Sequence, residues 1–197
     1  DGKKASQQDV INKENYEKRG FATADIASDQ YHHYKEDVAL MKEMGFTAYR
    51  FSIAWSRVFP DGVGEVNEAG IQYYRNLIDE LRANGIEPIV TLYHYDLPWA
   101  LVEKYNGWLS RQVVDDFAYY ARYIINEFKD KVKYWLTFNE INAGMMAFGQ
   151  VLSTGTVQGY EGPAMGAPDD PQTRLQALHH QFVANAQALN YAHAHYP

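Results

Sequence analysis

Apolar residues recur along the chain in two alternating patterns, one with the period of a helix and one with that of a strand. Strand patterns rich in β-branched and aromatic residues fall at 46–53, 88–93 and 132–138. Helical patterns fall at about 34–44, 67–84, 110–128 and 171–195. A regular alternation of helix and strand is typical of parallel strands joined by right-handed crossover helices.

Turn and cap residues support these boundaries. Gly45 and the pair Asn84-Gly85 follow helical patterns at positions where glycine commonly ends a helix, and Asn67 and Ser110 can cap the next two helices. For the last helix we expect a buried stripe at helical spacing, made of Leu175, Leu178, Phe182, Ala186 and Leu189.

The distance between strands indicates the kind of sheet. The three strand patterns begin at about 46, 88 and 132, which gives long strand-to-strand units suited to a (β/α)8 barrel with elaborate loops. Eight such units would need roughly 340 residues, more than the chain contains. The predicted fold class is therefore α/β, an incomplete (β/α)8 TIM barrel from the N-terminal part of such a barrel.

The remaining segments lack clear periodicity. Residues 1–30 are rich in Lys, Gln, Asn and Asp and are predicted to be mostly loop, and 142–170 is predicted to be a Gly-, Met- and Pro-bearing loop. There is no linker-like or low-complexity stretch, so 1–197 is interpreted as one partial catalytic barrel.

Composition narrows the class of protein. The 197 residues carry a net charge of −7, which argues against a nucleic-acid-binding surface. The sequence has no cysteine, which excludes disulfides and thiolate metal sites and fits the cytoplasmic location that we expect. Its apolar runs are too short for a membrane span, so we expect no membrane partner. Aromatic residues reach 15%, which suits either sugar binding or a large core.

Polar residues stand where each strand pattern ends, and in a parallel barrel these ends carry the functional residues. Arg50 lies on the face of the first strand opposite the apolar face. Its charge needs a partner there, either a carboxylate or phosphate at the functional site or a structural salt bridge. His94 follows the second strand, where it can bind a hydroxyl group or be a hydrogen-bonded core histidine.

The third strand ends in Asn139-Glu140. A carboxyl group there suits general acid–base catalysis, and the amide beside it can orient a sugar hydroxyl. Strict alternation would place the two side chains on opposite faces. Both can reach one pocket only if the strand pairing ends or bulges at this point.

Four motifs occur in order along the chain: Asp29-Gln-Tyr-His-His-Tyr-Lys-Glu-Asp37, Tyr49-Arg-Phe-Ser-Ile-Ala-Trp-Ser-Arg57, His94-Tyr-Asp-Leu-Pro98 and Trp135-Leu-Thr-Phe-Asn-Glu140. Together they resemble the N-terminal part of glycoside hydrolase family 1, which contains β-glucosidases and 6-phospho-β-glucosidases. The resemblance runs from about residue 25 to the end of the chain.

The resemblance implies retaining hydrolysis of β-linked glycosides by two carboxyl groups. By motif, Glu140 would be the proton donor and base, Asn139 would bind the sugar 2-hydroxyl, and His94 would bind a neighbouring hydroxyl. Arg50 would support the nucleophile. The family places that nucleophile on a later strand, which this chain does not contain.

Two positions bear on the substrate. Family members that act on plain glucosides commonly have Trp after the histidine and Gln after the proline, where this sequence has Tyr95 and Trp99. Tyr95 would line the sugar site. The pattern is more similar to 6-phospho-β-glucosidases, so the predicted partner is a β-glucoside or phospho-β-glucoside substrate.

Alternatives remain open at this point. The chain could be a non-catalytic half-barrel that binds sugar, or an assembly module that associates with itself or with the missing C-terminal half of the barrel. A third possibility is another group of barrel glycosidases that shares only the Asn-Glu pair. The paired histidines have no ligand spacing with carboxylates, so we expect no metal and no cofactor.

Overall fold

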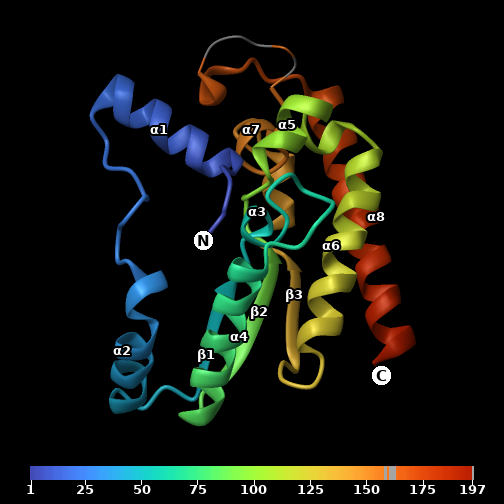
Figure 1. Cartoon of the computed structure of the whole chain (residues 1–197). Helices are drawn as coiled ribbons and strands as arrows, with labels where there is room; N and C mark the ends of the chain where they lie inside the picture. The colour runs from blue at the N-terminus through green and yellow to red at the C-terminus, as the bar shows by residue number, and fades with distance from the viewer. Residues whose placement is uncertain (158, 160–162, 197) are drawn as a thin grey trace.

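The computed structural model describes residues 1–157, 159 and 163–196 (Figure 1). Part of the predicted loop at 142–170, namely 158 and 160–162, lies outside the described residues. The elements in chain order are α1 Gln7–Arg19, α2 Gln30–Glu43, β1 Ala48–Ser52, α3 Trp55–Val58, α4 Glu68–Ala83, β2 Glu87–Tyr93, α5 Trp99–Tyr105, η1 Gly107–Leu109, α6 Gln112–Phe128, β3 Tyr134–Phe138, η2 Ile141–Met145, α7 Gly149–Leu152, η3 Ala164–Gly166 and α8 Pro171–His195.

The three strands form one parallel sheet in the order β1-β2-β3, as the alternation of elements predicts. Arg50 pairs with Ile89 in the register of β1 and β2, and Thr91 pairs with Leu136 across β2 and β3. Because the strands are parallel, their carboxyl ends lie at one edge of the sheet. The result is the predicted open segment of a (β/α)8 barrel.

One apolar core joins the sheet to its helices. Its fully buried members come from β2, α4, α6 and the segment after β1, and they include Trp55, Ile71, Val90, Leu92 and Phe117. On β1 the alternation is as predicted: Phe51 is buried, Tyr49 is partly buried, and Arg50 is exposed. The helices therefore cover one face of the sheet and leave the polar face of β1 open.

Residues 1–30, predicted to be mostly loop, contain the 13-residue helix α1. The N-cap Ser6 and Asp9 form a capping box, in which the Ser6 N–H donates to Asp9 at 2.8 Å, and Gly20 closes the helix in the left-handed conformation. Only Gln7 and Ile11 of this helix are buried, so it has no apolar stripe to detect. The Ser6-to-Asp9 spacing and Gly20 were the available signals.

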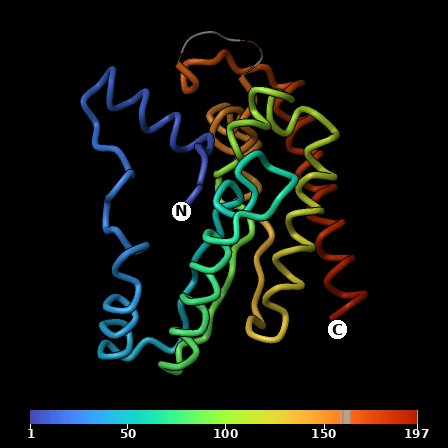
Figure 2. The backbone as a smooth tube through the Cα atoms, in the orientation of Figure 1, coloured from blue at the N-terminus to red at the C-terminus, as the bar shows by residue number. Residues whose placement is uncertain are grey.

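Helix α1 is tied to the far part of the chain. The Gln7 side chain donates to the Val151 carbonyl at 3.2 Å, and Ser6 forms an isolated bridge with Pro98. In Figure 1 and Figure 2 the chain enters α1 near α5 and α7, follows the helix away from them, and then runs in an extended stretch to α2 at the opposite end of the molecule. The N-terminal segment thus lies at the end of the sheet that carries the candidate site.

Helix α8 has the predicted bounds, but its buried face differs from the prediction. Of the predicted stripe only Leu178 is buried, whereas Leu175, Phe182 and Leu189 are 43%, 50% and 41% exposed and Ala186 is exposed too. The other buried apolar side chains of α8 are small, Ala177, Ala184 and Ala188. Small residues allow α8 to lie close to α6, and the sequence alone could not show that this stripe, rather than the larger one, faces α6.

Candidate active site

The structure brings the predicted residues to one edge of the sheet. Arg50 lies in β1, His94 follows β2 directly, and Asn139 and Glu140 follow β3. The charges of Arg50 and Glu140 both affect the pKa of His94, so each of these two groups lies near the imidazole. Three neighbouring parallel strands are therefore sufficient to assemble the predicted group of side chains.

Arg50 joins the three strands through hydrogen bonds. Its Nε donates to Thr91 Oγ1 at 3.0 Å, and its Nη2 donates to Asn139 Oδ1 at 2.8 Å. Thr91 is fully buried and Asn139 is nearly so. The guanidinium is thus met by a hydroxyl and an amide oxygen, and these bonds fix Asn139 relative to β1.

Glu140 reaches the same region as Asn139 because the strand pairing stops between them. The last ladder bond runs from the Asn139 N–H to the Tyr93 carbonyl at 2.8 Å. Glu140 then adopts φ 40° and ψ 52° at the start of η2, which is the left-handed region. The requirement that the ladder end at this point is met, and the Glu140 side chain is exposed.

Tyr95 lies against Glu140 from the neighbouring strand end. It too has a left-handed backbone, with φ 59°, and its hydroxyl donates to Glu140 Oε2 at 2.9 Å. Burial, the hydrogen bond to Glu140 and the charge of Glu140 together raise the Tyr95 pKa to about 12, against the neighbouring Asn139 side chain, which lowers it. Tyr95 therefore connects the two polar residues at the end of β3.

His94 is suited to neutral hydrogen bonding. Partial burial lowers its pKa, the Arg50 charge lowers it further, and the Glu140 charge acts in the opposite direction. A neutral imidazole has one N–H donor and one acceptor nitrogen, which is the pair that a sugar hydroxyl can use. The His94 ring also meets the Tyr95 ring edge to face, with centroids 5.6 Å apart.

Asp96 is a site-supporting residue that the sequence reasoning did not single out. It accepts a hydrogen bond from the His94 backbone N–H at 3.0 Å, which closes the turn after β2. Burial raises its pKa to about 6, against backbone hydrogen bonds that lower it. An Asx turn would run forward from Asp96, whereas this bond runs back to a residue two positions earlier, so no sequence signal indicated the role.

Arg174 on α8 is a second residue that sequence reasoning missed. Its Nη1 donates to the carbonyls of Gly144 at 3.0 Å and Met145 at 2.6 Å, and its Nε donates to Asp169 at 2.7 Å. These bonds hold η2, the short helix that Glu140 begins. A single Arg on a long helix gives no sequence signal for this contact.

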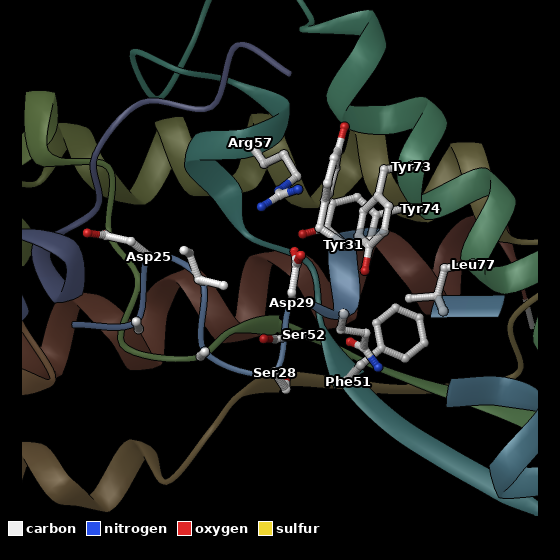
Figure 3. A pocket seen from close by; sticks show the side chains of 14 residues that line it. Asp25, Ser28, Asp29, Tyr31, Phe51, Ser52, Arg57, Tyr73, Tyr74 and Leu77 are labelled. Carbon is white, nitrogen blue, oxygen red and sulfur yellow. The ribbon is translucent and has the colours of Figure 1, made fainter. Parts of the chain in front are cut away.

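A pocket of about 300 Å³ lies beside β1, away from this group of side chains (Figure 3). The first two family-like motifs meet there, and none of the predicted site residues lines it. The Arg57 guanidinium lies over the Tyr31 ring at 4.7 Å and pairs with Asp1 at 2.8 Å, and in Figure 3 Asp29 points toward it. Those motif residues therefore order the N-terminal segment against β1.

The described part of the chain contains neither a metal-binding cluster nor a membrane-spanning helix. Within 1–157, 159 and 163–196, no cluster of three or more His, Asp or Glu residues could hold a metal ion. None of the helices in these ranges is long and apolar enough to cross a membrane.

Three parallel strands with crossover helices, and with polar side chains gathered at the carboxyl ends, define the chain as a segment of a (β/α)8 barrel. The family model for glycosyl hydrolase family 1 matches residues 1–197. The chain belongs to this family.

Individual relatives agree with the family assignment. Beta-glucosidase 6 of Oryza sativa subsp. japonica is 62% identical over 120 residues, which is 61% of this chain and 23% of that protein. Aryl-phospho-beta-D-glucosidase BglC of Bacillus subtilis (strain 168) is 44% identical over 189 residues, which is 96% of this chain and 38% of that protein.

Solved structures of β-glucosidases also match this chain over nearly its whole length. A crystal structure of a rice β-glucosidase has a TM-score of 0.88 and 44% identity, and the match covers all of this chain and 41% of the rice chain. The family 1 β-glucosidase of Thermotoga maritima has a TM-score of 0.84 and 35% identity over 98% of this chain and 42% of that chain. The chain thus spans about two fifths of these structures.

Proposed function

We propose that this chain supplies the acid–base half of a retaining β-glycosidase that acts on β-glucosides. The observation that carries the proposal is the exposed Glu140 carboxyl group at the carboxyl edge of the sheet, beside Asn139 and within range of Arg50 and His94. This edge is where (β/α)8 enzymes hold their catalytic residues. Family membership and the β-glucosidase relatives support the same activity.

Each side chain has a role in the proposed reaction. Glu140 protonates the leaving oxygen and then, as the base, activates the water that releases the sugar. Asn139 binds the 2-hydroxyl, and neutral His94 binds a neighbouring hydroxyl. The nucleophile comes from a barrel strand outside these 197 residues, and Arg50 lies where it can keep that carboxylate ionised.

A β-glucoside 6-phosphate is the second candidate substrate. The match to the Bacillus subtilis aryl-phospho-β-glucosidase extends over nearly the whole chain and favours it, whereas the rice relative is more identical over a shorter stretch. Of the two departures from the plain-glucosidase pattern, Tyr95 lies at the site. Trp99 lines a separate pocket with Lys4, Ala5 and Pro60, so it carries less weight for specificity.

The experiment exchanges the matching segment of the Bacillus subtilis relative for this sequence, which gives a complete barrel that we call the swap enzyme. It is assayed with a chromogenic β-glucoside and with the 6-phosphate of the same compound. Glu140→Gln should lower turnover of a substrate with a poor leaving group by roughly 10²–10⁴-fold. Azide, a nucleophile that needs no base, should restore turnover of an activated glucoside in Glu140→Ala.

Glu43→Gln on α2 is the matched control, because it makes the same change on an exposed helix and should leave turnover intact. If Glu140→Gln hydrolyses the poor substrate as fast as the unchanged swap enzyme, the acid–base assignment is wrong. The preference for the 6-phosphate is also compared between the swap enzyme and the same enzyme with Tyr95→Trp. A stronger preference in the enzyme with Tyr95 would assign part of the phosphate preference to this segment.

The isolated chain is expected to be inactive, because a proton donor without its nucleophile supplies half of the mechanism. Both outer strands of the described sheet, β1 and β3, have one edge without a partner strand, so we also propose that the isolated chain self-associates. Hydrolysis assays and size-exclusion chromatography of the 197-residue protein test these two statements. We further propose a cytoplasmic location, which cell fractionation would test.

A further inference from the structure

A chain of polar side chains crosses the candidate site from β1 to Glu140. Arg50 donates to Asn139 Oδ1 at 2.8 Å, the Asn139 side chain lies near enough to the Tyr95 hydroxyl to lower its pKa, and that hydroxyl donates to Glu140 Oε2 at 2.9 Å. The Glu140 backbone carbonyl lies 3.3 Å from the same hydroxyl. Among the described residues, Tyr95 is the one whose side chain hydrogen-bonds the Glu140 carboxyl group.

Backbone geometry makes the contact specific. Tyr95 and Glu140 both occupy the left-handed region directly after their strands, at φ 59° and φ 40°. With an extended backbone at either position, strand alternation would turn one side chain away from the other. The two unusual conformations therefore serve one contact, between a phenol from the end of β2 and a carboxyl group from the end of β3.

We propose that Tyr95 is a positioning residue for Glu140: its hydroxyl holds the Glu140 carboxylate in one orientation by linking it to Asn139 and Arg50. This inference rests on the proposed function for what Glu140 does, but not for the contact itself. It gives Tyr95 a role beyond lining the sugar site. An exposed glutamate without this bond would sample several rotamers, and a proton donor must lie within hydrogen-bond reach of the leaving oxygen.

The contact is tested on the 197-residue chain by titrating Tyr95. The protein is labelled with fluorotyrosine, which titrates at lower pH than tyrosine, and the Tyr95 resonance is assigned by its loss in Tyr95→Phe. Glu140→Gln removes the charge and keeps the side-chain shape, so the Tyr95 midpoint should fall by roughly one pH unit. Tyr134, at the opposite end of β3, is the internal control and should not move.

The positioning role is tested in the swap enzyme with Tyr95→Phe, which keeps the ring and the backbone preference. Hydrolysis of a glucoside with a poor leaving group should fall by roughly tenfold, whereas an activated leaving group, which needs little proton donation, should be nearly unaffected. A Tyr95 midpoint that stays unchanged in Glu140→Gln would overturn the proposed contact. An equal loss with both leaving groups would overturn the positioning role and make Tyr95 a sugar-binding residue.

These outcomes are separate from the fate of the proposed function. The Tyr95 titration reports the hydrogen bond whether or not Glu140 is a proton donor. Loss of turnover in Glu140→Gln together with an unchanged Tyr95 midpoint would support the function and reject this inference.

Discussion

The turn that holds His94 is closed by the Asp96 carboxyl group, whose ionised form is disfavoured by burial. Burial raises the Asp96 pKa from 3.8 to about 6 in the folded chain. The folded protein therefore binds the Asp96 proton more tightly than the unfolded chain does. The stabilisation from this proton is fully present below about pH 4 and is lost as the pH rises through about 6.

The size of the effect follows from the displacement of the pKa. A rise from 3.8 to about 6 corresponds to about 3 kcal/mol at about 1.36 kcal/mol per pH unit. Asp96 is partly exposed to solvent, so we expect about 2 kcal/mol. Glu127 acts in the opposite direction, because its pKa is lowered mainly by its hydrogen bond to Arg75 and it therefore adds stability as the pH rises. A comparison variant is therefore needed to isolate the Asp96 contribution.

Asp96→Asn provides that comparison, because it keeps an oxygen acceptor for the His94 N–H and removes the titration. Urea unfolding of both proteins at intervals from pH 4 to 8 gives two stability curves. The unchanged chain should lose about 2 kcal/mol relative to Asp96→Asn between pH 4 and 7, on top of any constant offset. Parallel curves, or a difference that grows in favour of the unchanged chain, would show that burial does not govern this carboxyl group.

Three further changes test other parts of the structure, each by urea unfolding. Arg174→Met leaves two carbonyls and Asp169 without their donor and should cost about 3 kcal/mol, with backbone NMR shifts moving in η2. Trp55→Phe removes the bond from Nε1 to the Gly62 carbonyl at 2.8 Å in the core and should cost about 2 kcal/mol. At Glu140 the glycine variant should be more stable than the alanine variant by about 1 kcal/mol, the reverse of the order expected at Gln72 on α4, because φ is positive at Glu140.

The sheet could be predicted from the sequence because its information is local. Each strand is a short apolar run, and each long crossover helix has its own apolar stripe, so period and order were enough to give three parallel strands. The short helices were missed for the opposite reason. Helix α3 and helix α5 are 4 and 7 residues long, which is too short for a stripe to be recognised.

The candidate site could be predicted as a set of residues but not as a geometry. Strand ends indicated Arg50, His94 and Glu140, since parallel strands bring their carboxyl ends together. The contact between Tyr95 and Glu140 depends on two left-handed residues that are neither Gly nor Asn, and no pattern of residue types predicts that. Asp96 and Arg174 act through backbone groups, which the sequence does not distinguish.

Left-handed backbone outside glycine costs of order 1–3 kcal/mol for each residue and persists where the surrounding structure imposes it. Tyr95 and Glu140 both carry this cost at adjacent strand ends, and their side chains hydrogen-bond each other. Two contacts support these conformations: Asp96 closes the turn at His94, and Arg174 holds η2 behind Glu140. Relaxing either support would return one backbone toward the extended region and carry its side chain out of reach of the other. The two left-handed residues and the polar side chains that support them therefore form one arrangement, in which stability is lost at Tyr95 and Glu140 to keep the Glu140 carboxyl group in place.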